Sequence, residues 1–254
     1  MSITNDITNR QQSIKLHTIG HAIVLGVGGI GSWVALDLAL SGMVSKLYLV
    51  DPDIVEPSNL NRTPFRIADI NESKVAALKY LIIERRSQDV EIFMTRTSDA
   101  LADEIYSSIQ KTDSYTYKDI NRYQNQIRNL DVIIDCRDDV YTDFYKLPFK
   151  YYKVGYDGMS CTIDGNPRET AVWGQANGYR FTPSFVCSAQ LIANLVVTDV
   201  LTVKDEDVPM NMVDEIVKTP FDRCGRLNKA ITFDASDIVE TMYNVQHKPK
   251  VTSG

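Results

Sequence analysis

A glycine-rich run near the N-terminus is the first feature of this sequence of 254 residues that could do chemistry. Its glycines have the spacing GxGGxG and are Gly26, Gly28, Gly29 and Gly31. Glycine lets a backbone approach phosphate closely, and the backbone amides and the start of the next helix can then face the anion. The run predicts a nucleotide-binding turn, although a tight strand-to-helix turn that binds nothing has the same pattern.

Charged residues follow the glycine run. Asp51 ends an apolar run 20 residues after Gly31, where a carboxylate can accept hydrogen bonds from ribose hydroxyls. Arg62 comes after the acidic turn that contains Asp51 and Asp53. A cation at this place has little use in hydride transfer, but it can neutralise the phosphates of ATP. By position alone, Asp51 could also be a solvated turn residue, and Arg62 could be one side of a surface salt bridge.

The elements that must position these residues can be traced in the sequence. Residues 21–26 form an apolar run that predicts a buried strand, and residues 32–41 have the spacing of a helix that Gly42 would end. Residues 46–50 predict a second strand, which ends at Asp51. Strand, glycine turn, helix and strand together indicate a βαβ unit of the doubly wound type.

The rest of the chain continues this alternation. Helices are expected over residues 70–87 (with Asn71 or Ser73 as N-cap), 99–109 and 184–203, and strands over 91–97, 131–135, 151–155, 161–164 and 170–174. The predicted fold class is therefore α/β. We expect a doubly wound, Rossmann-like, mostly parallel sheet with helices on both faces and a β-rich C-terminal extension.

Composition limits the class of protein. The chain has 27 Lys and Arg against 33 Asp and Glu, a net charge of −6, whereas nucleic-acid-binding proteins usually carry a basic face. The polar N-terminus lacks the apolar core of a secretory signal, and no apolar run reaches the roughly 18 residues that span a membrane. The four cysteines are scattered and form no CxxC pair, which favours a reducing compartment. We expect a cytoplasmic protein with no nucleic-acid or membrane partner.

Three segments in order give a more specific signal. They are GVGGIGSWVALDLALSG (residues 26–42), LVDPDIVEPSNLNR (49–62) and DINESKVAAL (69–78). In these segments the sequence resembles the ubiquitin-activating enzymes and their bacterial relatives, the ThiF- and MoeB-type adenylyltransferases, well over residues 9–139 and loosely beyond. The resemblance implies one adenylation domain over residues 1–254, with an ATP-binding half at about 9–140 and an acceptor-binding half at about 150–245.

Such enzymes use ATP and Mg²⁺ to convert a carboxylate into an acyl-adenylate with release of pyrophosphate. Because the triphosphate repels a carboxylate, cations must neutralise the phosphates and hold the reacting atoms in line. The resemblance assigns Arg62 and Lys74 to the phosphates, Asp138 to a Mg²⁺ ion that is held through ATP, and Asp51 to the ribose. It also places Asp53 and Asn59 beside the nucleotide. The glycines of the turn are Gly26, Gly28, Gly29 and Gly31.

Three assignments keep an alternative. Asp139 adjoins Asp138, so the metal-binding position could be shifted by one residue, and both carboxylates could instead cap a helix. Lys74 could be an ordinary surface lysine near a helix start. Arg10, followed by Gln11, resembles the family's N-terminal arginine that reaches the neighbouring subunit's ATP site in a two-fold homodimer. Its spacing to the glycine run is short, so a solvated terminal arginine fits equally well.

Cysteine usage departs from the family pattern. Many members hold a structural zinc with two CxxC pairs, and this chain has none, so no structural zinc is expected. No cysteine matches a catalytic motif for a thioester or persulfide step. Cys136 and Cys187 are expected to be buried as small hydrophobic residues, whereas Cys161 lies between glycine-rich turns and stays open.

The leading hypothesis is an enzyme that adenylates the C-terminal carboxylate of a small ubiquitin-like or sulfur-carrier-type protein, or of a peptide. A second is adenylation of a carboxylate on modified tRNA, since the GGIGSW segment resembles that branch too. A third is an NAD- or FAD-dependent oxidoreductase, which leaves Arg62 and Lys74 unexplained. A fourth, a module that binds ATP without turnover, does not account for the full set of matched polar residues.

Overall fold

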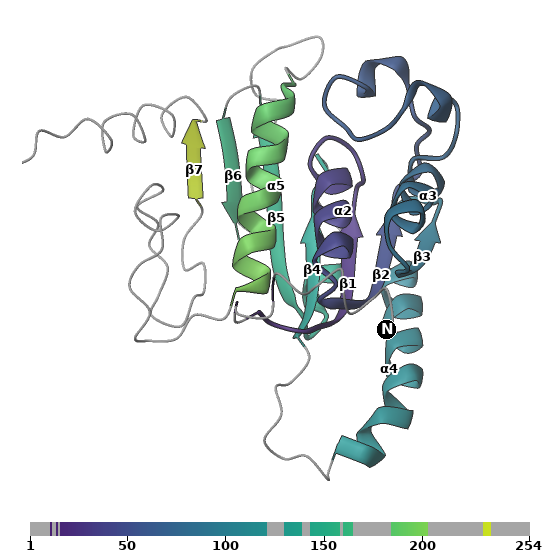
Figure 1. Ribbon diagram of the computed structural model, residues 1–254. Helices are drawn as coiled ribbons and strands as arrows, with labels where there is room; N and C mark the ends of the chain where they lie inside the picture. The colour runs from purple at the N-terminus through teal and green to yellow at the C-terminus, as the bar shows by residue number, and fades with distance from the viewer. Residues whose placement is uncertain are drawn as a thin grey trace, which may run out of the picture.

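The computed structural model describes residues 11, 14, 16–120, 130–138, 143–157, 160–164, 184–202 and 231–234. Within this part, seven strands form one sheet in the order β3-β2-β1-β4-β5-β6-β7 (Figure 1). The strands are β1 (Ile19–Leu25), β2 (Val44–Val50), β3 (Asp89–Phe93), β4 (Leu130–Asp135), β5 (Lys150–Asp157), β6 (Ser160–Asp164) and β7 (Ile231–Asp234). The helices are α2 (Gly31–Ser41), α3 (Lys74–Arg85), α4 (Asp99–Ile120) and α5 (Val186–Leu201), with short 3₁₀ turns η2 (Pro57–Asn59), η3 (Ile67–Asp69) and η4 (Asp143–Lys146).

The strand order is that of a doubly wound fold. β3, β2, β1, β4 and β5 are parallel, and the chain passes from β1 to β2 and β3 on one side before it crosses to β4 and β5 on the other. β6 and β7 then extend the sheet in antiparallel pairing. The predicted α/β fold with a mostly parallel sheet is therefore confirmed. The strand expected over residues 170–174 lies outside the described residues.

Helices cover both faces of the sheet, as the sequence predicts. α2, α3 and α5 pack on one face, and α4 with η4 packs on the other (Figure 1). Side chains of β1 alternate between the two cores, with Ala22 and Val24 on the α2 side and Ile23 and Leu25 on the α4 side. A central parallel strand buried on both faces must be apolar throughout, which explains the continuous hydrophobic run of β1.

Three predicted elements have a boundary that is wrong by more than two residues. α3 begins at Lys74 rather than residue 70 because Asn71 has a left-handed φ of 73°, and Ser73 occupies the N-cap position without making a side-chain capping bond. β3 covers residues 89–93 rather than 91–97, since it pairs in register with β2 and ends opposite Val50. α4 continues to Ile120, beyond the expected end at residue 109. None of the helices in the described part is both long and apolar enough to cross a bilayer.

Candidate functional site

A pocket lies at the carboxyl ends of the parallel strands, where β1 has β2 on one side and β4 on the other. This switch point is where doubly wound folds bind their ligands. The pocket is lined by Gly26, Gly28, Gly29, Ile30, Asp51, Asp53, Arg62, Lys74, Cys136, Arg137, Asp138, Val154, Gly155, Tyr156 and Ser184. Eight of the residues that the sequence assigns to the site therefore share one pocket, although they come from five separate segments of the chain.

The glycines of the turn have different physical reasons to be glycine. A Cβ at Gly31 would lie 1.9 Å from the backbone oxygen of Gly26, so the turn closes tightly on the first residue of α2. A Cβ at Gly29 would lie 2.5 Å from the hydroxyl oxygen of Tyr156. A Cβ at Gly28 would meet no atom within 4 Å, and Gly28 lines the pocket. Gly28 is therefore the position where a ligand can approach the backbone.

The glycine turn gives a first prediction, from a matched pair of variants. Gly31→Ala is expected to lower the free energy of unfolding by about 1–3 kcal/mol or more, since it forces a methyl group into a backbone oxygen. Gly28→Ala is expected to change it by less than about 1 kcal/mol, because its methyl group enters open space, and to weaken nucleotide binding instead. Urea unfolding and calorimetry measure the two effects. Equal destabilisation of both variants would contradict this division of roles.

Asp51 ties the glycine turn to the end of β2. Its Oδ2 accepts a hydrogen bond from the Val27 backbone amide (2.8 Å), and its Oδ1 accepts one from the Asp53 amide (2.9 Å). Asp51 is buried, and burial raises the pKa of its carboxyl group, while the Lys74 charge and the two amides oppose this rise without cancelling it. The carboxylate that the sequence assigns to the ribose therefore also shapes the turn.

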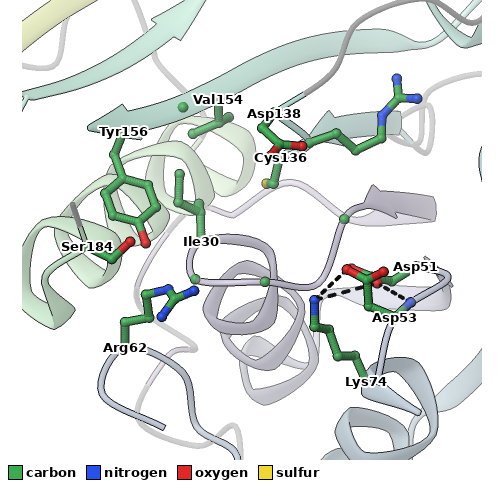
Figure 2. A pocket seen from close by; sticks show the side chains of 15 residues that line it. Ile30, Asp51, Asp53, Arg62, Lys74, Cys136, Asp138, Val154, Tyr156 and Ser184 are labelled. Atoms are coloured by element: carbon green, nitrogen blue, oxygen red, sulfur yellow. Dashed lines mark hydrogen bonds and ion pairs between the residues drawn. The ribbon is translucent and has the colours of Figure 1, made fainter. Parts of the chain in front are cut away.

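Lys74 stands opposite this acidic strand end. As the first residue of α3, it places its Nζ 2.8 Å from Asp53 Oδ2 and 3.9 Å from Asp51 Oδ1 (Figure 2). The α3 helix is anchored there by a hydrogen bond from the Lys74 backbone amide to the Asp53 carbonyl oxygen. Lys74 is thus not an isolated surface lysine but a largely buried cation held at the pocket by two carboxylates.

Arg62 lies on the other side of the glycine turn from Lys74 (Figure 2). Its backbone carbonyl accepts a hydrogen bond from Trp33 Nε1 of α2 (2.9 Å), which fixes the loop independently of the arginine side chain. The Arg62 Nη1 donates hydrogen bonds to the Ser58 carbonyl and to Asn61 Oδ1. The guanidinium is held by its own loop while it lines the pocket.

Asn59 supports this loop and does not line the pocket in the structure. It is buried, and its Oδ1 accepts a hydrogen bond from the Glu56 backbone amide (3.0 Å), which closes the η2 turn. Thr63, which follows Arg62, donates a hydrogen bond from its hydroxyl to the Asn59 carbonyl oxygen (2.9 Å). Both polar side chains hold the backbone that presents Arg62.

A buried charge cluster supports the other wall of the pocket. Asp135, fully buried at the end of β4, accepts hydrogen bonds from Arg137 Nε (2.9 Å) and Nη2 (2.6 Å) and from the Tyr151 hydroxyl (2.5 Å). Lys153 Nζ of β5 lies 3.3 Å from Asp135 Oδ1 and also contacts the Arg137 carbonyl. Asp135 therefore fixes the Arg137 side chain, which packs against Gly26 of the glycine turn.

The structure places the remaining sequence-predicted residues as follows. Asp138 is exposed at the pocket, directly after this cluster, whereas Arg10 and Asp139 lie outside the described residues. Cys161 is buried in β6. Cys187 is exposed near the start of α5, so its predicted burial is wrong, because the apolar pattern of this helix turns that position outward.

Cys136, which is also predicted to be buried, is only partly buried, because it follows the end of β4 and lines the pocket. Removal of the thiol from water and the nearby Asp135 charge both raise the pKa of Cys136, so the thiol stays protonated at neutral pH. A protonated thiol is a weak nucleophile.

Sequence reasoning missed Tyr156, Ser184 and Arg137. Tyr156 is near the carboxyl end of β5, and Ser184 precedes α5, so both reach the pocket through the sheet topology alone. The one available signal was that Tyr156 immediately follows the strand predicted over residues 151–155, and ligands of doubly wound folds bind at the carboxyl ends of the strands.

A doubly wound sheet, with a glycine turn, an acidic strand end and flanking cations at its switch point, defines a protein of the Rossmann-like class. A family model narrows this class: the chain matches the ThiF family over residues 4–203 and belongs to that family.

Curated relatives match parts of the chain. Over 26% of its length it is 41% identical to the NEDD8-activating enzyme E1 catalytic subunit of Arabidopsis thaliana. Over 29% of its length it is 44% identical to the tRNA threonylcarbamoyladenosine dehydratase of Bacillus subtilis (strain 168). These matches span 14% and 34% of the two relatives, respectively.

Solved structures share the fold. PaaA superposes with a TM-score of 0.51 at 22% identity, covering 71% of this chain and 54% of PaaA. The microcin C7 biosynthetic enzyme MccB, in complex with N-formylated MccA, superposes with a TM-score of 0.51 at 19% identity, covering 76% of this chain and 58% of MccB. The chain thus spans little more than half the length of these structures.

Proposed function

We propose that this protein is an ATP-dependent adenylyltransferase that activates the C-terminal carboxylate of a small ubiquitin-like protein or a peptide. The observation that carries this proposal is the pocket itself, which is lined both by the open backbone of Gly28 and by two cations, Arg62 and Lys74. Membership of the ThiF family supports the same reading. A hydride-transfer site would leave both cations without a role.

Each group has a task in this proposal. The Gly28 backbone admits the polyphosphate, and the charges of Arg62 and Lys74 neutralise it so that a carboxylate can approach the α-phosphorus. Asp51 accepts hydrogen bonds from the ribose with the lone pairs that its two backbone bonds leave available. The carboxylate oxygen then forms a bond to the α-phosphorus while the bond to pyrophosphate breaks.

Mg²⁺ fits this pocket through the nucleotide. Within the described residues, no group of three or more His, Cys, Asp or Glu side chains could hold a metal ion by itself. Mg²⁺ is commonly bound by one or two carboxylates together with substrate phosphates, and Asp138 offers an exposed carboxylate at the pocket. Asp138 would hold the ion, which would supply further neutralisation of the phosphates.

The acceptor is proposed from the relatives' names. The MccB structure is a complex with N-formylated MccA, and the Arabidopsis relative is named for activating NEDD8, so we propose a small protein or peptide as the substrate class. The Bacillus relative acts on tRNA, which keeps a carboxylate on modified tRNA as a second candidate. We also propose a homodimer located in the cytoplasm. Sedimentation at micromolar concentration tests the dimer.

Calorimetry and isotope exchange test the proposal. We expect Mg-ATP to bind and NAD not to bind, and exchange of labelled pyrophosphate into ATP to require an acceptor, with peptides ending in Gly-Gly compared against bulk tRNA. Gly28→Ala serves as the matched control, since its fold is expected to persist while binding is lost. Binding of NAD without any heat from ATP would overturn the proposal, and exchange stimulated only by tRNA would favour the second candidate.

A further inference from the structure

Tyr156 occupies a place in the pocket that the proposed function does not yet use. It projects from β5 over the glycine turn, with its hydroxyl oxygen 2.5 Å from where a Cβ of Gly29 would lie. Its side chain, the Ser184 side chain and the Arg62 guanidinium point toward one another on one side of the turn (Figure 2). Three distant segments, β5, the start of α5 and the loop after β2, therefore meet at one phenol.

The hydrogen-bonding roles at this phenol are restricted. The Arg62 guanidinium and the Ser184 side chain both lie near enough to the Tyr156 hydroxyl to act on it electrostatically. Because Arg62 can only donate, a hydrogen bond between the two has the Tyr156 oxygen as its acceptor. Burial raises the pKa of Tyr156 more than Ser184 and Arg62 lower it, so the phenol keeps its proton at neutral pH. A phenol that accepts from a cation has an O–H that is a stronger donor. The Ser184 contact lowers the pKa of Tyr156, as a donor to the phenol oxygen does, and with Ser184 donating the phenol can direct its own O–H to an oxygen of a pocket ligand.

Arg62 needs a second point of attachment. Its hydrogen bonds to Ser58 and Asn61 are both made by Nη1, so its own loop holds one end of the guanidinium. A long side chain held at one end loses conformational entropy when an anion orders it. A contact from Tyr156 on the neighbouring wall removes part of that loss before the anion arrives, which is the physical meaning of pre-organisation.

We propose that Tyr156 is a positioning residue of the adenylation site: its hydroxyl holds the Arg62 guanidinium over the glycine turn and donates a hydrogen bond to a phosphate oxygen of ATP bound between Gly28 and Arg62. This inference rests on the proposed function. It also explains why Gly29 must lack a side chain, because any Cβ there would displace the Tyr156 hydroxyl.

Tyr156→Phe tests this role because it removes the hydroxyl and keeps the ring. Its affinity for Mg-ATP, measured by calorimetry, is expected to fall about 10- to 100-fold, the range for loss of a hydrogen bond to a charged group. Adenosine, which has no phosphate, is expected to bind the variant and the unaltered protein alike. Tyr80→Phe is the matched control, since Tyr80 is an exposed tyrosine of α3 outside the pocket.

A double-mutant cycle separates positioning from general damage. In an Arg62→Ala background, Tyr156→Phe is expected to have a markedly smaller effect, because the residue it positions is gone. Ser184→Ala, which removes the other partner of the phenol, is expected to weaken Mg-ATP binding in the same direction and serves as the second variant if Tyr156→Phe folds poorly.

The outcomes are distinguishable. Unchanged Mg-ATP affinity in Tyr156→Phe and Ser184→Ala, an equal loss of adenosine affinity, or fully additive effects with Arg62→Ala would each overturn the role of Tyr156 and leave the proposed function standing. Failure of the unaltered protein to bind Mg-ATP would overturn the proposed function and this inference with it.

Discussion

Replacing Arg62 with alanine is expected to slow acceptor-dependent pyrophosphate exchange by about 10²- to 10³-fold, the usual loss when a donor that stabilises developing charge is removed. The effect is expected to fall on the reaction and not on the fold. The Trp33 indole binds the Arg62 backbone carbonyl, and Thr63 and Asn59 hold the loop by bonds that do not involve the arginine side chain.

The control for this prediction is Arg85→Ala. Arg85 is an exposed arginine in the last turn of α3, outside the pocket, and its loss removes the same charge from the chain. Exchange by the Arg85→Ala protein is expected to stay near that of the unaltered protein. A similar rate for both variants would show that Arg62 does not act on the phosphates.

Replacing Asp135 with asparagine is expected to lower the free energy of unfolding by about 3–5 kcal/mol, the loss typical of removing one partner from a buried ion pair. Asp135 is fully buried and is the carboxylate that faces both Arg137 and Lys153. Asparagine keeps the shape of the side chain but removes the negative charge that lies between the two cations. Urea unfolding measures the change.

Glu84→Gln is the matched control, because Glu84 also pairs with an arginine but lies half-exposed at the surface. Exposed ion pairs contribute about 0–1 kcal/mol, so this variant is expected to unfold almost like the unaltered protein. If both variants lost equal stability, the Asp135 cluster would not be the support that its burial indicates.

The stability from Asp135 has a defined pH dependence. Burial raises the pKa of this carboxyl group, but the Arg137 hydrogen bonds and the Lys153 charge outweigh burial, so its pKa lies below the ordinary value. A lowered pKa means that the contribution is present above the unfolded-state pKa of about 3.9 and is lost as the pH falls through the folded-state pKa. The difference in unfolding free energy between unaltered protein and Asp135→Asn is therefore expected to be constant from about pH 5 to 8 and to shrink in more acidic solution.

Local patterns were sufficient for the first βαβ unit. The apolar run of β1, the helical spacing before Gly42 and the strand ending at Asp51 all lie within a short stretch, where periodicity and glycine conformation act over neighbouring residues. The ends of helices and strands could not be predicted as well from the sequence. α3 starts later than predicted because Asn71 has a left-handed backbone, and the ends of β3 are set by its pairing with β2. Both depend on contacts that hydrophobic spacing does not encode.

The candidate site likewise has residues that the sequence predicts and residues that only the structure brings into it. The sequence by itself determined the glycine turn, the acidic strand end and the candidate cations Arg62 and Lys74, because their types and spacing are local and specific. Only the tertiary structure decided that Tyr156 and Ser184 stand beside Arg62, and that Asp135 faces Lys153 as its register partner across β4 and β5. The physical reason is that strand order and register arise from pairing between distant segments, so which side chains meet at the carboxyl edge of the sheet is settled only when the sheet has formed.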